Sequence, residues 1–482
     1  MRAGGHTSAQ SVIKRGVNMS IGGGRKVNID MTSGPIMKKM IMFAFPLMCS
    51  SVLQLLFNAA DTVVVGQFAG KHSLAAVGSN GALINLMTNL FIGLSVGSNV
   101  LIAKAIGARD KEHTNKLVHT SIVISLIGGV FLMMFGILFA KDILVIMNAP
   151  KEVIGLATTY LKIYFIGLPA MMVYNFGSAI LRAVGDTRRP LYFLSIAGVI
   201  NVLFNLLFVI VYKMDVAGVA WATVISQVIS ATLIMICLMK EESDIRVNPK
   251  QLRIDGDSLL RILRIGLPAG LQGSLFSLSN VVIQSSINKF GSTVLAGNSA
   301  AQNLEGFVYV SMNALHQATL SFTSQNMGAG RYERVGKILK DGLILVVITG
   351  MVLGGLMVLF GHQLLHIYYP KQDVINKGFE RILVVCGTYY FCGIMDVMVG
   401  SIRGMGYSVM PMIVSLIGAC GLRIVWLKTF FKMARFHRPF YIYITYPVSW
   451  IITIAAHVIC FYIVSKKLRK TPEKVPAKGG KS

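Results

Sequence analysis

Charged residues are scarce in this chain. Asp, Glu, Lys and Arg make up 14% of its 482 residues, whereas soluble domains average about 25%. Hydrophobic residues account for 54% of the chain, and the mean hydropathy is +0.65. This composition excludes an ordinary soluble domain. It predicts an integral membrane protein, in which the lipid bilayer takes the place of a soluble core.

Cysteine is also rare, and its placement indicates neither a disulfide framework nor a zinc site. The six cysteines all lie in apolar segments without metal-ligand spacing. The histidines show no acid–histidine pairing at i, i+4 of the kind that metal catalysis uses. No G-x4-G-K-[ST] phosphate loop occurs, so we expect an ion gradient rather than ATP to supply energy. The only cofactor that we expect is a coupling ion, H+ or Na+.

Acidic residues are few beside the 46 Lys and Arg, and the formal net charge is +26. The positive charges gather in the N-terminal arm, the C-terminal tail and every second loop. By the positive-inside rule this distribution indicates membrane topology with both termini cytoplasmic, and it does not indicate nucleic-acid binding. The basic loop between the last two apolar segments would favour the opposite orientation, but charges near the C-terminal end of the chain usually affect topology less than the sum of the earlier ones.

Apolar segments follow one another along most of the chain, and each is long enough to cross a bilayer as a helix. They lie at 36–67, 74–106, 117–140, 153–183, 190–212, 216–239, 262–289, 294–327, 338–361, 376–404, 409–433 and 439–465. The sequence therefore predicts an all-α membrane protein with twelve transmembrane helices.

An internal repeat relates the two halves of the chain. Each of the following pairs is separated by 221 positions: Gly70 and Gly291, Gly107 and Gly328, Glu112 and Glu333, Lys116 and Lys337, Arg182 and Arg403, Pro190 and Pro411. A constant offset predicts two six-helix lobes that enter the membrane from the same side, around a central cavity. We expect these parts: a disordered basic arm (1–34), an N-terminal lobe (35–240), a cytoplasmic linker (241–261), a C-terminal lobe (262–465) and a basic tail (466–482).

One acid stands inside the first apolar segment. Asp61 follows Gln54 and Asn58 at positions i, i+4 and i+7, so the three share one polar stripe of a helix. A carboxylate at membrane depth is costly unless it faces a cavity, a partner or an ion. The stripe therefore predicts a wet interior and a functional acid, although a structural Asp at a helix kink is the alternative.

These motifs together resemble the bacterial multidrug and toxic compound extrusion (MATE) family, nearest its DinF-like branch. The resemblance runs from about residue 36 to 465. It is carried by P-x14-D-x4-G in the first helix (Pro46, Asp61, Gly66), by the G-A turn after the second and eighth helices, and by R-x2-G with a following Pro after the fourth and tenth. It implies a multi-pass protein of the bacterial inner membrane that acts as a monomer.

The resemblance implies roles for several residues of the N-terminal lobe. In that family the acid matching Asp61 is implicated in proton or sodium coupling. Family members often place Asn and then Asp on the fifth helix, where this chain has Asn201 and Asn205, so the second acid is missing. Asn175 and Thr223 are candidate oxygen ligands nearby, or alternatively hydrogen-bond partners between helices.

In the C-terminal lobe the resemblance implies a second ion site. Asp396 matches an acid of the NorM-like cation site, so Na+ is expected at Asp61 or Asp396. Glu305 lies where family members place an acid in the substrate cavity. The seventh-helix Glu of the NorM pattern is absent, and Cys392 stands in place of a tyrosine, so that site is incomplete. Arg423 is expected to snorkel or to pair with Asp396.

Polar side chains and polarizable Met and aromatic side chains are the candidates for substrate recognition. The chain holds 26 Met and 25 Phe, which suit a pocket for many apolar cations but are common in membrane helices anyway. Candidate substrate contacts are Gln54, Asn58, Gln284, Glu305, Tyr309, Met312, Asn313 and Gln317.

The sequence thus predicts an ion-gradient-driven antiporter that exports cationic amphipathic drugs or toxic metabolites by alternating access. A flippase of the same superfamily that moves a lipid-linked precursor is the alternative, although such proteins tend to carry cationic residues in the cavity. An intramembrane enzyme would need a convergent catalytic set, and the spans show none. A receptor or scaffold would not need a duplicated bundle with buried acids.

Overall fold

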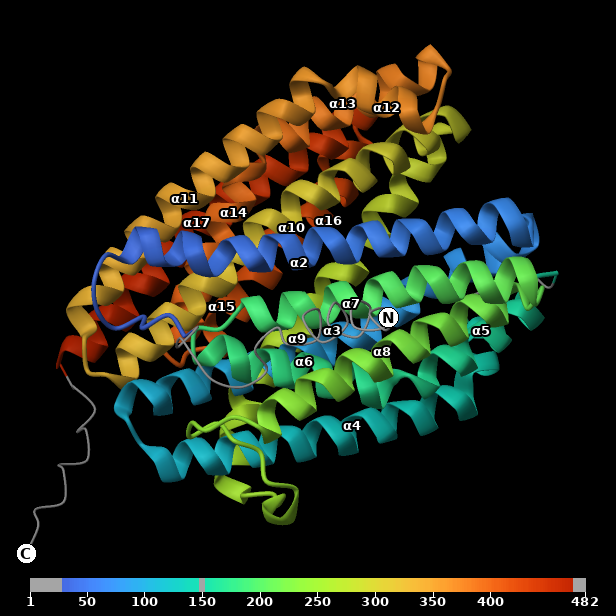
Figure 1. Ribbon diagram of the computed structural model, residues 1–482. Coiled ribbons are helices and arrows are strands. Elements are labelled where there is room, and N and C mark those ends of the chain that lie inside the picture. Colours follow the sequence, from blue (N-terminus) through green and yellow to red (C-terminus); the bar gives the residue numbers. More distant parts are fainter. Residues whose placement is uncertain (1–27, 147–151, 471–482) are drawn as a thin grey trace, which may run out of the picture.

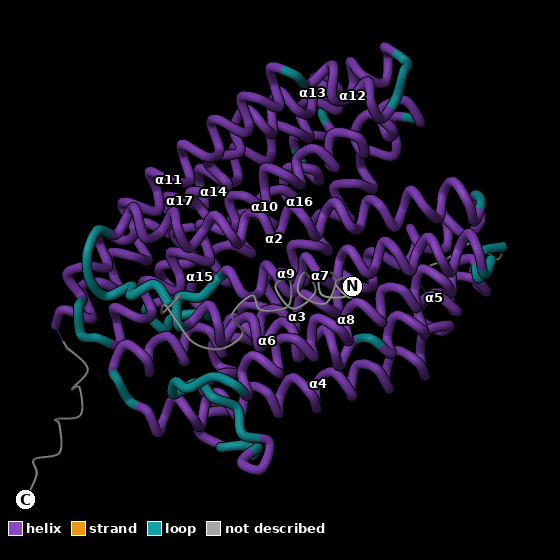
Figure 2. The backbone as a smooth tube through the Cα atoms, in the orientation of Figure 1, coloured by secondary structure: helices purple, strands orange, loops and turns teal. Residues whose placement is uncertain are grey.

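The computed structural model describes residues 28–146 and 152–470, which form only helices and loops (Figures 1 and 2). The helices of the N-terminal lobe are α2 Ile36–Val64, α3 Lys71–Ala108, α4 Lys111–Ile146, α5 Ile154–Ile166, α6 Leu168–Ala183, α7 Arg188–Leu206 and α8 Asp215–Met239. Those of the C-terminal lobe are α9 Gly256–Ile287, α10 Ser292–Gly328, α11 Tyr332–Leu359, α12 Gly361–Tyr368, α13 Gln372–Val385, α14 Tyr389–Gly404, α15 Val409–Ser415, α16 Leu422–Lys428 and α17 Pro439–Lys470.

The twelve predicted spans are confirmed, each by a long helix or by helices that follow one another closely. Within the described residues, nine helices are long and apolar enough to cross a membrane, or ten if the bent pair α5–α6 is one span. That pair bends by 46° at Gly167. The two long helices α9 and α10 fall outside this count because polar residues lower their hydropathy.

Two lobes form the molecule, and they are splayed. In Figure 1 the helices of both lobes lie together at the left and diverge towards the right, with α12 and α5 at the two far corners. We call the converging end the basic end. It holds the turns at 109–110, 184–187, 240–255, 329–331 and 405–408.

The basic end contains a reciprocal contact between α3 and α10. A Cβ placed on Gly107 would collide with the carbonyl oxygen of Gln325, and one placed on Gly328 would collide with the carbonyl oxygen of Lys104. Gly107 and Gly328 are 221 positions apart, and so are Lys104 and Gln325. The two halves of the repeat are therefore self-complementary at this point, as expected of a two-fold relation.

Burial along α3 and α10 differs between the two ends of the molecule. Residues 93–100 of α3 are buried at every position, whereas His72, Gly78 and Asn85 are exposed. Residues 318–328 of α10 are likewise buried, whereas Ser299 and Asn303 are exposed. The helices at the lobe interface are thus enclosed at the basic end and open to solvent or lipid on one face towards the far end.

Residues 28–34 depart from the predicted disordered arm, because they form a strap across the basic end. Met31 is fully buried, its N–H donates to Gln325 Oε1 (3.3 Å), and its carbonyl accepts from Asn326 Nδ2 (2.9 Å). On the other lobe, the N–H of Ile29 donates to the carbonyl of Gly185 (3.4 Å). The strap therefore touches both lobes. The rest of the arm lies outside the described residues.

Candidate functional site

Asp61 occupies the last full turn of α2, just before the chain changes to a π-helix. The π-helix η1 spans Val65–Ala69, and a second one, η2, spans Leu207–Val211 directly after α7. The two π-helices contact each other. Such wide turns are uncommon and are frequent at functional sites. Their pairing places the end of α2 against the end of α7.

The Asp61 carboxylate is bound by an amide of α7, that of Asn205, and by no cation of the described residues. Asn205 Nδ2 donates to Asp61 Oδ1 and also lies 3.3 Å from Asn201 Oδ1. Asp61 is half-buried, while Asn205 is fully buried and its Oδ1 has no hydrogen-bond partner. Among the described residues, no Lys or Arg forms an ion pair with Asp61. The three residues that the sequence analysis grouped are thus brought together.

The predicted polar stripe of α2 is exposed along its first two positions. Gln54 lies two turns and Asn58 one turn before Asp61, and both are exposed. The stripe therefore runs from an exposed face of α2 to a half-buried carboxylate.

Asn175 and Thr223 are not joined to this cluster by hydrogen bonds. Asn175 Nδ2 donates to the carbonyl of Met171 (3.0 Å), and Thr223 Oγ1 donates to the carbonyl of Val219 (3.0 Å). Both bonds lie within the residue's own helix. Asp61 instead lies near enough to Tyr160 and Tyr164 of α5 to act on them electrostatically, and sequence reasoning missed these two tyrosines.

Asp396 in the C-terminal lobe is a second acid without a hydrogen-bonded cation. It is half-buried on α14, and its backbone carbonyl lies 2.6 Å from His316 Nδ1 of α10. Within the described part of the chain its carboxylate makes no hydrogen bond or ion pair. Arg403, on the same helix, acts on it electrostatically.

Glu305, which was predicted to be an acid of the substrate cavity, is instead bound to an arginine. It is buried, and its two carboxylate oxygens accept from Arg381 Nε (2.6 Å) and Nη2 (2.8 Å). Arg381 also donates to Asn298 Oδ1 (2.8 Å) and lies over the rings of Tyr443 and Tyr446. This bidentate ion pair fixes α10 against α13 and leaves no free carboxylate for a cargo in this conformation.

Arg423 does not pair with Asp396. Its Nε donates to Ser449 Oγ (2.9 Å), and its guanidinium lies 4.2 Å from the ring centroid of Tyr446. Aromatic faces attract cations, so α17 holds this arginine without an acid. The expected ion pair is therefore corrected to a stacked and hydrogen-bonded arginine.

The predicted substrate contacts on α10 are accessible only in part. Tyr309 is 41% exposed, and Asn313 and Gln317 are half-buried. Met312 is 1% exposed and packs in the apolar core with Phe43, so its placement on an accessible stripe was wrong. Helical spacing places Met312 next to Tyr309 on α10, but the Met312 side chain packs into the apolar core.

Gln284 belongs to a polar network at the far end of the C-terminal lobe. Its Oε1 accepts from Asn298 Nδ2 (2.9 Å) and Gln302 Nε2 (3.3 Å). Since Asn298 also binds Arg381, this network extends the Glu305–Arg381 pair towards α9.

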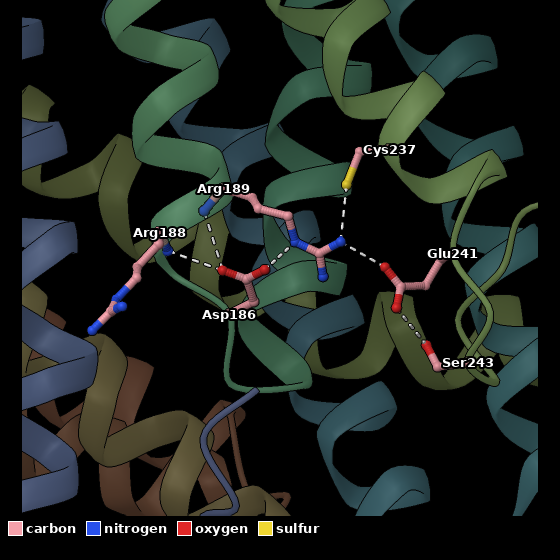
Figure 3. Close-up of polar contacts among 6 residues, drawn as sticks. All are labelled: Asp186, Arg188, Arg189, Cys237, Glu241 and Ser243. Atoms are coloured by element: carbon pink, nitrogen blue, oxygen red, sulfur yellow. Dashed lines mark hydrogen bonds and ion pairs between the residues drawn. The ribbon is translucent and has the colours of Figure 1, made fainter. Parts of the chain in front are cut away.

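An ion network fixes the basic end of the N-terminal lobe (Figure 3). Fully buried Asp186 accepts from the backbone N–H of Arg188 (3.0 Å) and Arg189 (3.1 Å) at the start of α7. The Arg189 side chain pairs with Asp186 and with Glu241 (2.6 Å) beyond the end of α8. This network holds the turn that contains Gly185, to which the strap is bound.

The described residues contain no group of three or more His, Cys, Asp or Glu side chains that could hold a metal ion. The candidate oxygen ligands for Na+ are the Asp61 carboxylate and the Asn205 Oδ1, although it is the amide nitrogen of Asn205 that faces Asp61 in this structure.

Comparisons with known proteins agree with this architecture. The MatE family model matches residues 46–207 and 268–427, about two thirds of the chain and once in each lobe. The probable multidrug resistance protein YoeA of Bacillus subtilis (strain 168) is 29% identical over 396 residues, 81% of this chain and 86% of that protein. The probable multidrug resistance protein NorM of Thermotoga maritima is 27% identical over 392 residues, 79% of this chain and 83% of that protein.

Solved structures share the fold. A MATE protein in complex with MaL6 superposes with a TM-score of 0.87 at 21% identity, covering 93% of this chain and all of that one (100%). A multidrug resistance MATE family transporter of the MOP superfamily, solved in an outward-facing conformation, superposes with a TM-score of 0.86 at 22% identity and the same coverage. The DinF-like branch stays a prediction. The repeat, the two-lobe helical fold and the family match lead to one conclusion: this chain belongs to the MATE family of membrane transporters.

Proposed function

We propose that this protein is an ion-gradient-driven antiporter that exports cationic amphipathic compounds by alternating access, with Asp61 as the coupling group. The relatives' names, which refer to multidrug resistance, support an efflux role. The observation that carries the proposal is the half-buried Asp61 carboxylate, which accepts from the Asn205 amide instead of a cation.

The Asp61 cluster has the chemistry for exchange. A carboxylate with one amide donor can take up a proton, or it can bind Na+ together with the free Asn205 Oδ1. Rotation of the Asn205 amide would turn its oxygen towards an arriving cation or proton, since amide orientation follows the hydrogen-bond network. Binding of an ion neutralises the carboxylate and so weakens its attraction for a cationic cargo.

The proposal includes a direction of opening, which the burial of the lobe interface supports. The lobe interface is enclosed at the basic end and exposed towards the far end, so we assign this conformation as outward-facing, with both termini cytoplasmic. The cargo would leave from the far side while an ion binds at Asp61, and the lobes would then close.

Cationic cargo fits better than a lipid-linked pyrophosphate. Arg381, Arg403 and Arg423 in the C-terminal spans are buried and engaged with Glu305, Gln272 and Ser449. A flippase for an anionic precursor would need such arginines on an accessible face, so that alternative is disfavoured.

Transport in proteoliposomes, with proton and sodium gradients imposed separately, tests the proposal. We expect Asp61→Asn to reduce gradient-driven efflux of a lipophilic cation at least tenfold, and Asp110→Asn, in the exposed cytoplasmic turn, to leave it unchanged. Asn205→Asp, which restores the second acid, should alter the ion preference. Full coupled efflux by Asp61→Asn would overturn the proposal.

A further inference from the structure

The apolar cores at the basic end of the two lobes are equivalent in the repeat. Ile106, Leu181 and Val184 of the N-terminal lobe lie 221 positions before Met327, Ile402 and Met405 of the C-terminal lobe. Each set packs against the last helix of its lobe, α8 or α17. The two sites can therefore be compared side by side.

In the N-terminal lobe the chain itself completes this core. After α8 the linker turns back, and the N–H of Val247 donates to the carbonyl of Leu238 (3.1 Å). Ile245 and Val247 are each 1% exposed and pack among Leu117, Val118 and Leu181. Two apolar side chains of the linker thus fill the space beside α8.

In the C-terminal lobe the equivalent place is a cavity. Its volume is about 630 Å3, within the range of about 300–1,000 Å3 typical of ligand pockets. Met327, Val335, Met405 and Phe461 give it apolar walls, and α17 runs past it as a helix to Lys470. A Cβ added to Gly336, which also lines it, would meet nothing within 4 Å.

The charged residues of the cavity differ from their N-terminal counterparts. Glu112 is held by Lys116 at 2.7 Å, whereas its repeat partner Glu333 is exposed and forms no ion pair with a described residue. Glu333 and Lys466 both line the cavity, so its rim offers one acid and one base.

The cavity opens beside the lipid-facing side of α17. Ile459 and Tyr462 of α17 are 61% and 66% exposed, and Val458 and Ile463 beside them are also exposed. An apolar exposed face in a membrane-spanning helix contacts acyl chains. The mouth of the cavity therefore meets lipid at the level of the headgroups, where the basic end begins.

We propose that this cavity binds one phospholipid whose headgroup carries a primary amine. An acyl chain occupies the apolar walls where the N-terminal lobe has Ile245 and Val247. Lys466 binds the phosphate, and Glu333 accepts hydrogen bonds from the ammonium group. A choline headgroup has no N–H to donate, and a glycerol headgroup has no positive charge, so both should bind more weakly.

Native mass spectrometry of the purified full chain, with phosphatidylethanolamine, phosphatidylcholine or phosphatidylglycerol added in turn, tests the site. We expect one phosphatidylethanolamine to remain bound preferentially, by fivefold or more over the other two. Gly336→Leu should fill the cavity and remove the bound lipid. Gly355→Leu is the matched control, because Gly355 is an exposed glycine of the same helix with equal space around it.

Two further variants separate the headgroup contacts. Glu333→Gln should abolish the preference for phosphatidylethanolamine over phosphatidylcholine, and Lys466→Gln should weaken retention of both. Equal retention of all three lipids by the wild type, or full retention by Gly336→Leu, overturns the proposal. So does lipid binding that appears only after the chain is cut behind Lys470, because the cavity would then be a docking site for the protein's own tail.

Discussion

The two lobes share one scaffold, but Asp61 in the first and Glu305 in the second have opposite kinds of partner. In the N-terminal lobe Asp61 is half-buried and bound by an amide. In the C-terminal lobe Glu305 is buried and bound on both oxygens by Arg381. A neutral partner leaves the charge of an acid to be balanced by whatever arrives, whereas a guanidinium balances it permanently. The two acids are not repeat partners, because Val282 and Ile84 stand at the equivalent positions, so each lobe has its own acid, one suited to exchange and one to holding helices together.

The largest effect is expected from breaking the Glu305–Arg381 pair. Arg381→Met leaves a buried carboxylate without its cation, which costs about 3–5 kcal/mol of stability. Thermal unfolding in detergent, followed by intrinsic fluorescence, should show a large drop in Tm. Glu305→Gln together with Arg381→Met should recover part of the loss, since no lone charge remains.

Asp61→Asn is the matched comparison for that experiment. It removes a charge that no cation holds, so its Tm should stay close to that of the wild type while transport is lost. If Arg381→Met kept the wild-type Tm and lost only transport, the contrast between a structural and a functional acid would be wrong.

The two basic-end cores give the next prediction. Ile245→Ala removes a fully buried side chain from the N-terminal lobe and should cost about 2–5 kcal/mol. Tyr462→Ala beside the equivalent cavity should cost far less, because its side chain is 66% exposed. Denaturation midpoints of the two variants measure the difference. Equal losses of stability would show that the C-terminal core is packed as densely as the N-terminal one.

The two lobes should respond equally to substitutions at the glycine contact between α3 and α10. Gly107→Ala and Gly328→Ala each place a methyl group against a backbone carbonyl of the other helix. Overpacking of this kind costs about 1–3 kcal/mol. We expect the two substitutions to lower Tm by the same amount and to widen the distance between spin labels at the basic end. Markedly unequal shifts would argue against a reciprocal contact.

The smallest effect is expected in the strap. Burial alone would raise the pKa of Asp30, but hydrogen bonds from Ser33 and Thr32 and the charge of Lys39 outweigh it and lower the pKa to about 2. Because the folded pKa lies below the ordinary 3.8, the stabilisation is complete above that pH and is lost only as the pH falls through about 2. Asp30 therefore keeps the strap hydrogen-bonded throughout the physiological range.

Asp30→Asn should accelerate amide hydrogen exchange at the strap about tenfold at pH 7. The effect should stay local, because Met31 and Gln325 still bind each other across the junction. Glu242→Gln, at an exposed position of the linker, serves as the control. Unchanged exchange in Asp30→Asn would mean that the contacts of Met31 alone hold the strap.

Much of this fold could be predicted from the sequence, because its signals are local or periodic. Hydropathy located the twelve spans, and the 221-residue offset predicted two lobes before any contact was known. The grouping of Asp61 with Asn205 came from helix periodicity and family motifs. Their contact in the structure agrees with that grouping.

What could not be predicted depends on partners far apart in the chain. Arg381 lies 76 positions from Glu305, and no spacing rule links them. Tyr160 and Tyr164 come near Asp61 only because α5 and the end of α2 share one apolar core in three dimensions. Met312 shows the converse limit, since helical spacing cannot tell a face that meets solvent from one that meets a neighbouring helix.

The glycine contact between α3 and α10 has a consequence for movement. α10 has 37 residues and is therefore roughly 55 Å long, at about 1.5 Å per residue. Pivoting the lobes by only about 10° about a fulcrum at its basic end would shift the opposite tip by roughly 10 Å. The two glycines have no side chains at that contact, so the helices can pivot there without a change of rotamer, whereas the hydrogen bond from Ser321 to Asn99 further along the helices has to break before the lobes part.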